Sequence, residues 1–310
     1  MITYVWRAFP GGGGLIMPKK NNLRKAFEFA GFTLPALIAV LIFVETPFFM
    51  SVLYSFTKWN GLDKNPEFIG LANYKELLTD DKDMLNALAF TLAFTVMMVV
   101  LTNIISLILA IILDSDIKGR NILRAAFYVP NIISLIVIGY IWRFIFSDTF
   151  DSLYNITHAG IFQLSWLGDT RLAFFSVLIV SVWQAIGFYM VIYLAGIQTV
   201  PRELIEASYI DGAAGFKRFL KITLPLIMPS VTVCIFYSLS NALRTFDVIF
   251  SLTYGGPGSA TTSIALDIYK TAFISSRFGY GTAKSVVLFL LIMIVTVTQV
   301  TVFKKKEVEA

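Results

Sequence analysis

The chain has 310 residues, of which 57% are hydrophobic and 15% are charged, and its mean hydropathy is +0.75. Soluble globular domains are about half apolar and about a quarter charged, so this composition excludes an ordinary soluble protein and indicates a polytopic membrane protein. The net charge of +5 does not indicate nucleic-acid binding, because the basic residues form short clusters beside apolar segments. The single cysteine, Cys234, excludes a disulfide framework within the chain.

The N-terminal segment 1–32 is predicted to be a tail outside the membrane. Residues 1–16 are too short to span a bilayer and lack the small-residue cleavage site of a signal peptide. Met17 begins a more usual start, MPKKNNLRK, just after the run of glycines at 11–14. We hypothesise that translation begins at Met17 and that the upstream residues are an artefact of a translated ribosome-binding site. A flexible glycine-rich tail is the alternative.

Six segments are long and apolar enough to cross a bilayer, which takes about 20 residues of helix. Their apolar runs are continuous rather than alternating, and only helices or closed barrels satisfy the backbone in lipid. We therefore predict an all-α membrane domain over residues 33–303. Its six helices are expected at 33–56, 87–113, 125–146, 172–197, 223–243 and 285–303.

The distribution of basic residues predicts the orientation. With both termini in the cytoplasm, the inner segments 1–32, 114–124, 198–222 and 304–310 hold 15 of the 25 lysines and arginines, and the longer outer loops hold nine. Cytoplasmic loops carry an excess of Lys and Arg. Both tails and the loop 198–222 are therefore expected in the cytoplasm.

Polar and aromatic side chains inside the spans are candidates for a cavity, since they are costly in lipid and tend to face a cavity or partner helices. In the fifth span, Ser238, Asn241 and Thr245 recur at three or four residues and share one helix face. Ordinary packing between helices is the alternative for each residue. The candidates in the fourth and fifth spans are Gln184, Phe188, Tyr189, Ser238, Asn241 and Thr245.

The inner loop between the fourth and fifth spans is predicted to hold two short helices. Pro201 suits a first helical turn, Glu203 complements the helix dipole there, and Gly212 is a plausible C-terminal stop. The first helix is thus expected at 201–211, and the second through about residue 221. Such a helix on the membrane surface can seat in a groove of another protein.

An outer segment of unusual composition follows the fifth span. The run Gly255-Gly256-Pro257-Gly258 cannot lie inside a helix. Residues 254–284 are predicted to be one long outer loop, which is uncommon without a function.

These two segments resemble the permease subunits of bacterial ABC importers. The inner loop matches the family's cytoplasmic loop, except that Ser208 replaces the usual second alanine. The outer segment matches the Phe-Asp, Leu-Thr-x-Gly-Gly-Pro and Phe-Gly-Tyr-Gly stretches of sugar permeases at residues 246–247, 252–257 and 278–281, and FIGLANY at 68–74 and Val-Pro at 129–130 fit as well. The resemblance covers most of residues 33–303 and is closest to the maltose- and glycerol-phosphate-type carbohydrate group.

The resemblance implies a type I importer permease that carries a sugar by alternating access. The cavity candidates would then line the substrate path, and Gly255, Gly256 and Pro257 would contact an extracytoplasmic sugar-binding protein. The loop 198–222 would couple the permease to an ATPase. The residues expected to carry that coupling are Glu203, Glu206, Ala207, Asp211, Gly212, Ala213, Phe219 and Pro225.

The resemblance also implies partners. These are a second permease that is a related but different chain, a dimer of ATPase subunits that binds ATP and magnesium, and the sugar-binding protein, all at the bacterial cytoplasmic membrane. The chain itself is expected to hold no cofactor and to be no enzyme, because it lacks a G-x-x-x-x-G-K-[ST] segment and its single histidine, His158, has no catalytic neighbours. An ion-gradient-driven secondary transporter is the alternative, although no inverted repeat is evident. The cargo, a sugar or glycerol phosphate, stays open.

Overall fold

The computed structural model describes residues 20–213 and 215–304 of the chain. The chain divides into two units, Met1–Ser51 and Val52–Ala310. The hypothesis of a start at Met17 and the C-terminal residues 305–310 lie outside the described residues.

The described part of the first unit, from Lys20 onward, is one long helix. It consists of α1 (Lys20–Val40), a π-helical turn η1 (Leu41–Glu45) and the beginning of α2 (Thr46–Tyr54). The stretch Phe29–Tyr54 is apolar and long enough to cross a membrane, close to the predicted span at 33–56. Apolar side chains are exposed along this helix, Phe32 by 88% and Phe43 by 77%. A surface of this kind suits lipid or a neighbouring helix.

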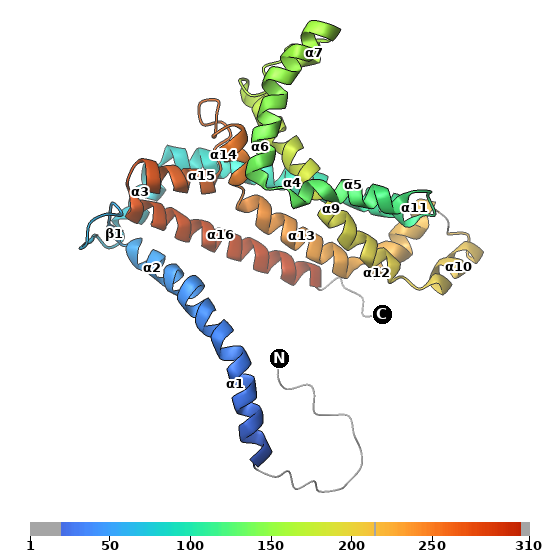
Figure 1. Cartoon of the computed structure of the whole chain (residues 1–310), viewed down its shortest axis with the longest axis horizontal. Helices are drawn as coiled ribbons and strands as arrows, with labels where there is room; N and C mark the ends of the chain where they lie inside the picture. Colours follow the sequence, from blue (N-terminus) through green and yellow to red (C-terminus); the bar gives the residue numbers. More distant parts are fainter. Residues whose placement is uncertain (1–19, 214, 305–310) are drawn as a thin grey trace. The chain divides into compact units, whose positions relative to one another are not determined.

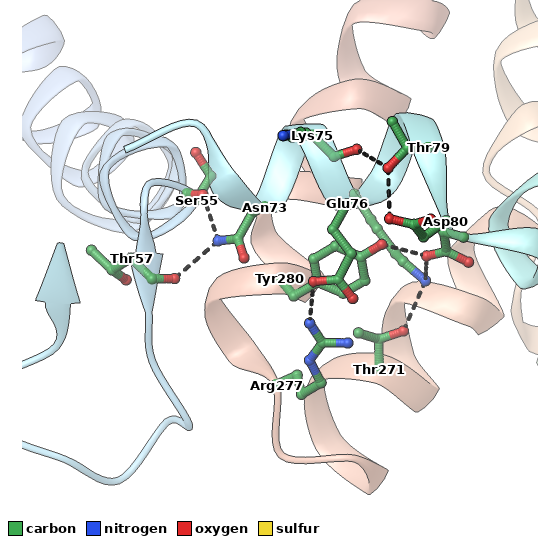
Figure 2. Close-up of polar contacts among 12 residues, drawn as sticks. Ser55, Thr57, Asn73, Lys75, Glu76, Thr79, Asp80, Thr271, Arg277 and Tyr280 are labelled. Carbon is green, nitrogen blue, oxygen red and sulfur yellow. Dashed lines mark hydrogen bonds and ion pairs between the residues drawn. The ribbon is translucent and has the colours of Figure 1, made fainter. Parts of the chain in front are cut away.

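The second unit begins with a small hairpin and a short helix, which an all-α prediction omits. Strands β1 (Thr57–Lys58) and β2 (Glu67–Phe68) pair antiparallel, and α3 (Ala72–Thr79) follows. The buried amide of Asn73 donates hydrogen bonds to the carbonyl oxygens of Ser55 (2.8 Å) and Thr57 (3.0 Å), as Figure 2 shows. Asn73, in the FIGLANY segment, thus holds the hairpin against α3.

Long helices form the centre of the second unit. Helix α4 (Lys82–Asp114) packs against α9 (Thr170–Gln198) and α13 (Met228–Leu243), and α13 packs against α16 (Phe278–Lys304). Helix α5 (Arg120–Ile132) lies against α9, where a Cβ on Gly187 would come within 2.0 Å of the Phe127 carbonyl oxygen. Only glycine allows the two backbones to approach this closely, as is common between membrane helices.

The third predicted span, 125–146, is not one helix. After α5 the chain is extended at Ile133 and then forms α6 (Leu135–Phe144), a π turn η2 (Ile145–Thr149) and α7 (Phe150–Thr157). The two parts are bent by 97°; α6 packs against α14 (Asp247–Leu252), and α7 projects away from the long helices of this unit in Figure 1. Pro130 lacks an N–H in the last turn of α5, which favours an ending there. A short helix α8 (Gly160–Gln163) follows.

The fifth predicted span, 223–243, is also bent. The inner loop forms α10 (Arg202–Ile210), α11 (Gly215–Arg218), a π turn η3 (Phe219–Thr223) and α12 (Leu224–Leu226), so the second short helix runs beyond its expected end. The chain then bends by 76° before α13. Pro229 lies in the first turn of α13, where its missing N–H is tolerated but a continuous helix is not.

The outer loop expected at 254–284 is largely helical. Helix α14 (Asp247–Leu252) is followed by a turn, α15 (Ile264–Tyr269) and a π turn η4 (Lys270–Ile274), and α16 begins at Phe278 rather than 285. The glycine and proline run that led to this prediction does lie in a turn, but the helices begin soon after it, and the polar residues Asp267 and Lys284 are buried there and paired with each other.

Within the described residues, four helices are long and apolar enough to cross a membrane, or six if each bent pair counts as one span. This agrees with the six predicted membrane crossings. The orientation of the termini stays a prediction from the distribution of basic residues.

Candidate functional site

A cavity of about 480 Å³ lies where helices of the second unit are interrupted. One wall comes from the break between α5 and α6, with Asn131 and Leu135, and another from the break between α13 and α14, with residues 244–247. Transporters build substrate sites from discontinuous helices, because interrupted backbone is tolerated in a membrane only where it lines a cavity or is buried in protein.

Aromatic rings and neutral polar groups dominate the lining. The ring of Phe188 lies 5.1 Å from Tyr237 and 5.3 Å from Tyr189 between centroids, so three rings form one wall. The amides of Gln184 and Asn241 lie at the same cavity. Apolar walls with few convergent polar groups are typical of small-molecule sites. Flat C–H faces and hydroxyl groups of a sugar are chemically suited to such a lining.

The structure brings five of the six substrate-path candidates together at this cavity: Gln184, Phe188, Tyr189, Asn241 and Thr245. Ser238 is not among the described residues that line it. Its side chain is 1% exposed, and its hydroxyl accepts a hydrogen bond of 2.9 Å from the Asn103 amide of α4. Asn103 in turn accepts from the Tyr193 hydroxyl at 2.6 Å, so Ser238 belongs to a link between α4, α9 and α13.

Residues from distant parts of the chain complete the lining. Phe94 of α4 and Asn131 of α5 lie at the cavity, and sequence reasoning did not single them out. Asn131 follows the Val-Pro pair of the third span, which was the available signal. Arg244 and Asp247 add one charge of each sign, and Arg244 donates to the Asn241 side chain at 3.3 Å.

The inner loop forms the helix expected of it. Helix α10 has Pro201 as its N-cap residue, Glu203 in its first turn and Asp211 as its C-cap residue. Gly212 has a φ of 71°, a conformation that favours glycine, and the Ala213 N–H closes the turn by donating to the Ser208 carbonyl at 2.8 Å. The backbone conformation of this turn therefore explains why a glycine follows Asp211 at the end of α10.

One surface of this loop is exposed and largely apolar. We define the coupling surface as ten of the exposed residues of this loop, beside which the basic residues Arg202, Lys217 and Lys221 are also exposed: Glu203, Leu204, Glu206, Ala207, Tyr209, Ile210, Asp211, Gly212, Phe216 and Leu220. Ile210 is 88% exposed and Phe216 is 74% exposed. Ser208 is buried and turned inward, while Ala213, Phe219 and Pro225 are half-buried. Adjacent exposed apolar residues rimmed by carboxylates are typical of a protein–protein contact.

The Gly-Gly-Pro segment is folded into a tight turn. Gly255 is buried with a φ of 85°, and a Cβ there would lie 2.5 Å from the Thr262 hydroxyl. Thr261 donates to the Gly256 carbonyl at 2.7 Å, and the Gly256–Pro257 peptide bond is cis. Gly256 and Pro257 are half-buried, whereas Gly258 and Ser259 are exposed. A partner could reach this turn through its second half only, and the expected contact with a binding protein stays a prediction.

A family model described as "binding-protein-dependent transport system inner membrane component" matches residues 103–307, about two thirds of the chain. The chain belongs to this family. The match includes the coupling surface, most of the cavity and the Gly-Gly-Pro turn. The protein is therefore a membrane component of a transport system, and not an enzyme.

Relatives and solved structures agree with this membership. The chain is 44% identical to a probable starch degradation products transport system permease of Thermoanaerobacterium thermosulfurigenes, covering 90% of this chain and 94% of the relative. It is 36% identical to a multiple sugar-binding transport system permease of Streptococcus mutans (89% and 95%) and 34% identical to a trehalose/maltose permease of Thermococcus litoralis (87% and 91%).

The fold matches that of a bacterial ABC transporter involved in alginate import. The TM-score is 0.77 at 19% identity, over 92% of this chain and 98% of the other. A second structure, the alginate transporter in complex with an alginate-bound periplasmic protein, gives 0.78 at 20% identity, over 90% and 94%. At these identities the likeness shows the fold, which is that of an ABC importer permease.

Proposed function

We propose that the protein is the membrane-spanning subunit of an ATP-driven importer of sugars, with oligosaccharides as its cargo. The observation that carries the proposal is the cavity at the two helix breaks, lined by the rings of Phe188, Tyr189 and Tyr237 and by the amides of Gln184, Asn131 and Asn241. Relatives named for starch degradation products, multiple sugars and trehalose/maltose support the same cargo class.

The charges at the cavity favour a neutral cargo over a phosphate ester. Arg244 and Asp247 both line the cavity and balance each other. An anionic cargo such as glycerol phosphate would meet the Asp247 carboxylate as well as the Arg244 guanidinium. The remaining described polar groups of the lining are amides and hydroxyls, which suit sugar hydroxyls.

The coupling surface would be the contact with the ATPase. Its apolar residues Ile210 and Phe216 offer contact area, and the exposed Glu206 offers a carboxylate for an arginine on the partner. ATP and magnesium would be bound by a dimer of ATPase subunits and not by this chain. ATP binding would close that dimer, and α10 would pass the motion to α9 and to the helices around the cavity, opening the path outward.

The remaining partners complete the proposal. A second permease, related but different in sequence, would close the other side of the path, and an extracytoplasmic sugar-binding protein would deliver the cargo. The complex would lie in the bacterial cytoplasmic membrane with both termini of this chain inside, as the basic residues of the inner segments indicate.

The test is uptake of a panel of labelled sugars by proteoliposomes. The chain is purified with the subunits that accompany it from its native membrane, and Glu206→Ala is run beside the wild type. Uptake that requires ATP and the binding protein, with the ATPase lost from the variant, is the expected result and identifies the cargo. Uptake that ignores ATP but follows an ion gradient would overturn the proposal in favour of a secondary transporter.

A further inference from the structure

A buried lysine joins three helices at the end of the second unit that holds α3 and α15. Lys284 of α16 is 2% exposed, and its ammonium lies 2.8 Å from the Asp81 carboxylate and 2.7 Å from the Asp267 carboxylate. Its third contact is the Thr271 hydroxyl at 3.1 Å, seen in Figure 2. Because an ammonium has three N–H donors, each of them finds an acceptor. We call Lys284, Asp81 and Asp267 the ion clamp.

Each aspartate of the ion clamp belongs to a different element. Asp81 is the N-cap residue of α4: it accepts from the Met84 N–H at 2.7 Å and from the Tyr280 hydroxyl at 2.6 Å. Asp267 lies in α15, and α16 contributes both Lys284 and Tyr280. Separating these helices would leave charged groups buried without partners, which is strongly unfavourable.

A second ion pair lies beside the clamp. The Arg277 guanidinium is 2.7 Å from the Glu76 carboxylate of α3, and it lies 4.2 Å above the Tyr280 ring. This pair is partly exposed and joins α3 to the start of α16, as the dashed line at Arg277 in Figure 2 shows. We therefore expect α3 to move together with the three helices of the ion clamp, α4, α15 and α16.

Helix α15 connects the ion clamp to the cavity. Ser263, its N-cap residue, accepts from the Leu266 N–H at 3.2 Å and donates its hydroxyl hydrogen to the Thr245 carbonyl at 2.7 Å. Thr245 lines the cavity at the break between α13 and α14. The next residue, Ile264, donates its N–H to the Thr91 hydroxyl of α4 at 3.0 Å. The position of the break between α13 and α14 thus depends on α15, and Asp267 joins α15 to Lys284 of α16.

We propose that Lys284 is a positioning residue for transport: the ion clamp keeps α4, α15 and α16 together as one rigid body through the transport cycle and thereby sets the position of Thr245 at the cavity. This inference rests on the proposed function in sugar import. The described residues that line the cavity do not include Lys284, so its effect on the cargo passes through α15 and Ser263.

Cross-linking tests whether this body stays closed. In a background with Cys234→Ala, the pair Glu76→Cys and Arg277→Cys is cross-linked with a short bifunctional thiol reagent in proteoliposomes. Uptake after cross-linking should equal uptake before it, because α3 and α16 do not separate. The matched control is Asn131→Cys with Thr245→Cys, on opposite sides of the cavity, where cross-linking should stop uptake. Loss of uptake in the first pair, restored by cleaving the cross-link, would overturn the proposal.

Sugar preference tests whether the clamp positions the cavity or only stabilises the fold. Ser263→Ala removes the hydroxyl that holds Thr245 with little change in volume. We expect it to change the ratio of uptake rates for a short and a long sugar by about threefold, the size of one hydrogen bond between membrane helices. Lys284→Met should change the same ratio, and the double variant should change it no further, because both act on one connection.

A failure of the proposed function can be distinguished from a failure of this inference. If the wild-type protein takes up no sugar with ATP, the proposed function fails before the clamp is examined. If Lys284→Met is poorly folded, Asp267→Asn replaces it in the comparison with Ser263→Ala and the double variant, since it weakens the link to α15 alone. Equal loss of uptake for all sugars, with an unchanged ratio, would show a purely structural role and overturn the inference.

Discussion

The two ends of the second unit satisfy their side chains in different ways. At the end with α3 and α15, charged groups are buried and paired within the chain, with Lys284 at 2% and Asp267 at 6% exposure. At the opposite end, α10 and the helix after it leave Ile210 (88%) and Phe216 (74%) exposed beside carboxylates (Figure 1). The first end is completed by its own residues, whereas the second has the composition of a surface that another protein covers.

The two ends therefore suit different roles during transport. A buried, fully paired ion cluster resists separation, so it suits a part that moves as a unit. The exposed apolar side chains of α10 suit a contact that is made and changed during a cycle. The cavity is lined by residues of the helices that run between these ends.

The largest expected effect comes from breaking the ion clamp. Lys284→Met leaves two buried carboxylates without their cation and should lower the free energy of unfolding by about 3–5 kcal/mol. Thermal unfolding in detergent measures this effect. Lys58→Met, which removes an exposed lysine of the hairpin, is the control and should have almost no effect. Equal melting temperatures for the two variants would show that the buried ion clamp stabilises the fold no more than an exposed lysine does.

The next effect concerns the coupling surface. Ile210→Asp places a charge where the side chain is already exposed, so the stability of the isolated chain should hardly change. Docking of the ATPase should weaken by about 2 kcal/mol or more, as for a central contact residue, which is roughly thirtyfold in affinity. Co-purification and ATP-dependent uptake measure the loss. A variant that is unstable but still binds the ATPase would show that α10 is an internal element instead.

A smaller effect separates the two aspartates of the clamp. For Asp81, burial disfavours the charged form, but hydrogen bonds from Lys284, Tyr280 and the Met84 N–H outweigh it and lower the pKa. For Asp267, burial dominates and raises the pKa despite Lys284. The stabilising effect of charged Asp81 is present above its ordinary pKa and is lost as the pH falls through its folded value. The contribution of Asp267 has the opposite sign: it is present below its ordinary pKa and is lost as the pH rises through its folded value.

The two isosteric variants should therefore differ at neutral pH. Asp81→Asn should lower the free energy of unfolding by about 2 kcal/mol, the value of hydrogen bonds to a charged group. Asp267→Asn should be close to neutral, since it removes a carboxylate whose charge burial opposes. Thermal unfolding at pH 7 compares them. A larger loss for Asp267→Asn than for Asp81→Asn would contradict this assignment.

The smallest effect is expected for the exposed ion pair at the same end. Glu76→Gln removes the pairing with Arg277, but both side chains are more than 40% exposed and solvent screens their attraction. The loss in stability should be below about 1 kcal/mol. Melting in low and high salt measures it, and the wild type and the variant should converge as salt is added. A loss as large as that of Lys284→Met would mean that exposure does not separate the two ion pairs.

The sequence predicted much of the fold because its signals are local. Continuous apolar runs placed six membrane crossings, and Pro201, Asp211 and Gly212 placed α10 within a residue of its observed bounds. The errors arose where a long-range contact outweighs a local pattern. The Gly-Gly-Pro-Gly run suggested a loop through residue 284, yet the pairing of Asp267 with Lys284 allows both to lie inside a helical region that follows the run.

The candidate site was predicted in part for the same reason. Gln184, Phe188 and Tyr189 share one helix, so their spacing grouped them. Thr245 was expected on one helix face with Asn241, but α13 ends at Leu243, and Thr245 reaches the cavity from the break that follows. Ser238 follows the same spacing but turns to Asn103, 135 residues away in the chain. No periodicity within one helix shows which of its polar residues finds a partner on another helix.

The sequence by itself determined the membrane class, the number of crossings, the position of the coupling helix and membership of a permease family, since these depend on composition and on patterns within short segments. Only the tertiary structure decided that the break in the third span and the end of α13 meet at one cavity, that Phe94 and Asn131 join Gln184 and Asn241 there, and that Lys284 holds three helices together. Cavities and buried ion pairs are formed by side chains brought together from distant positions, and their geometry exists only after the helices have packed.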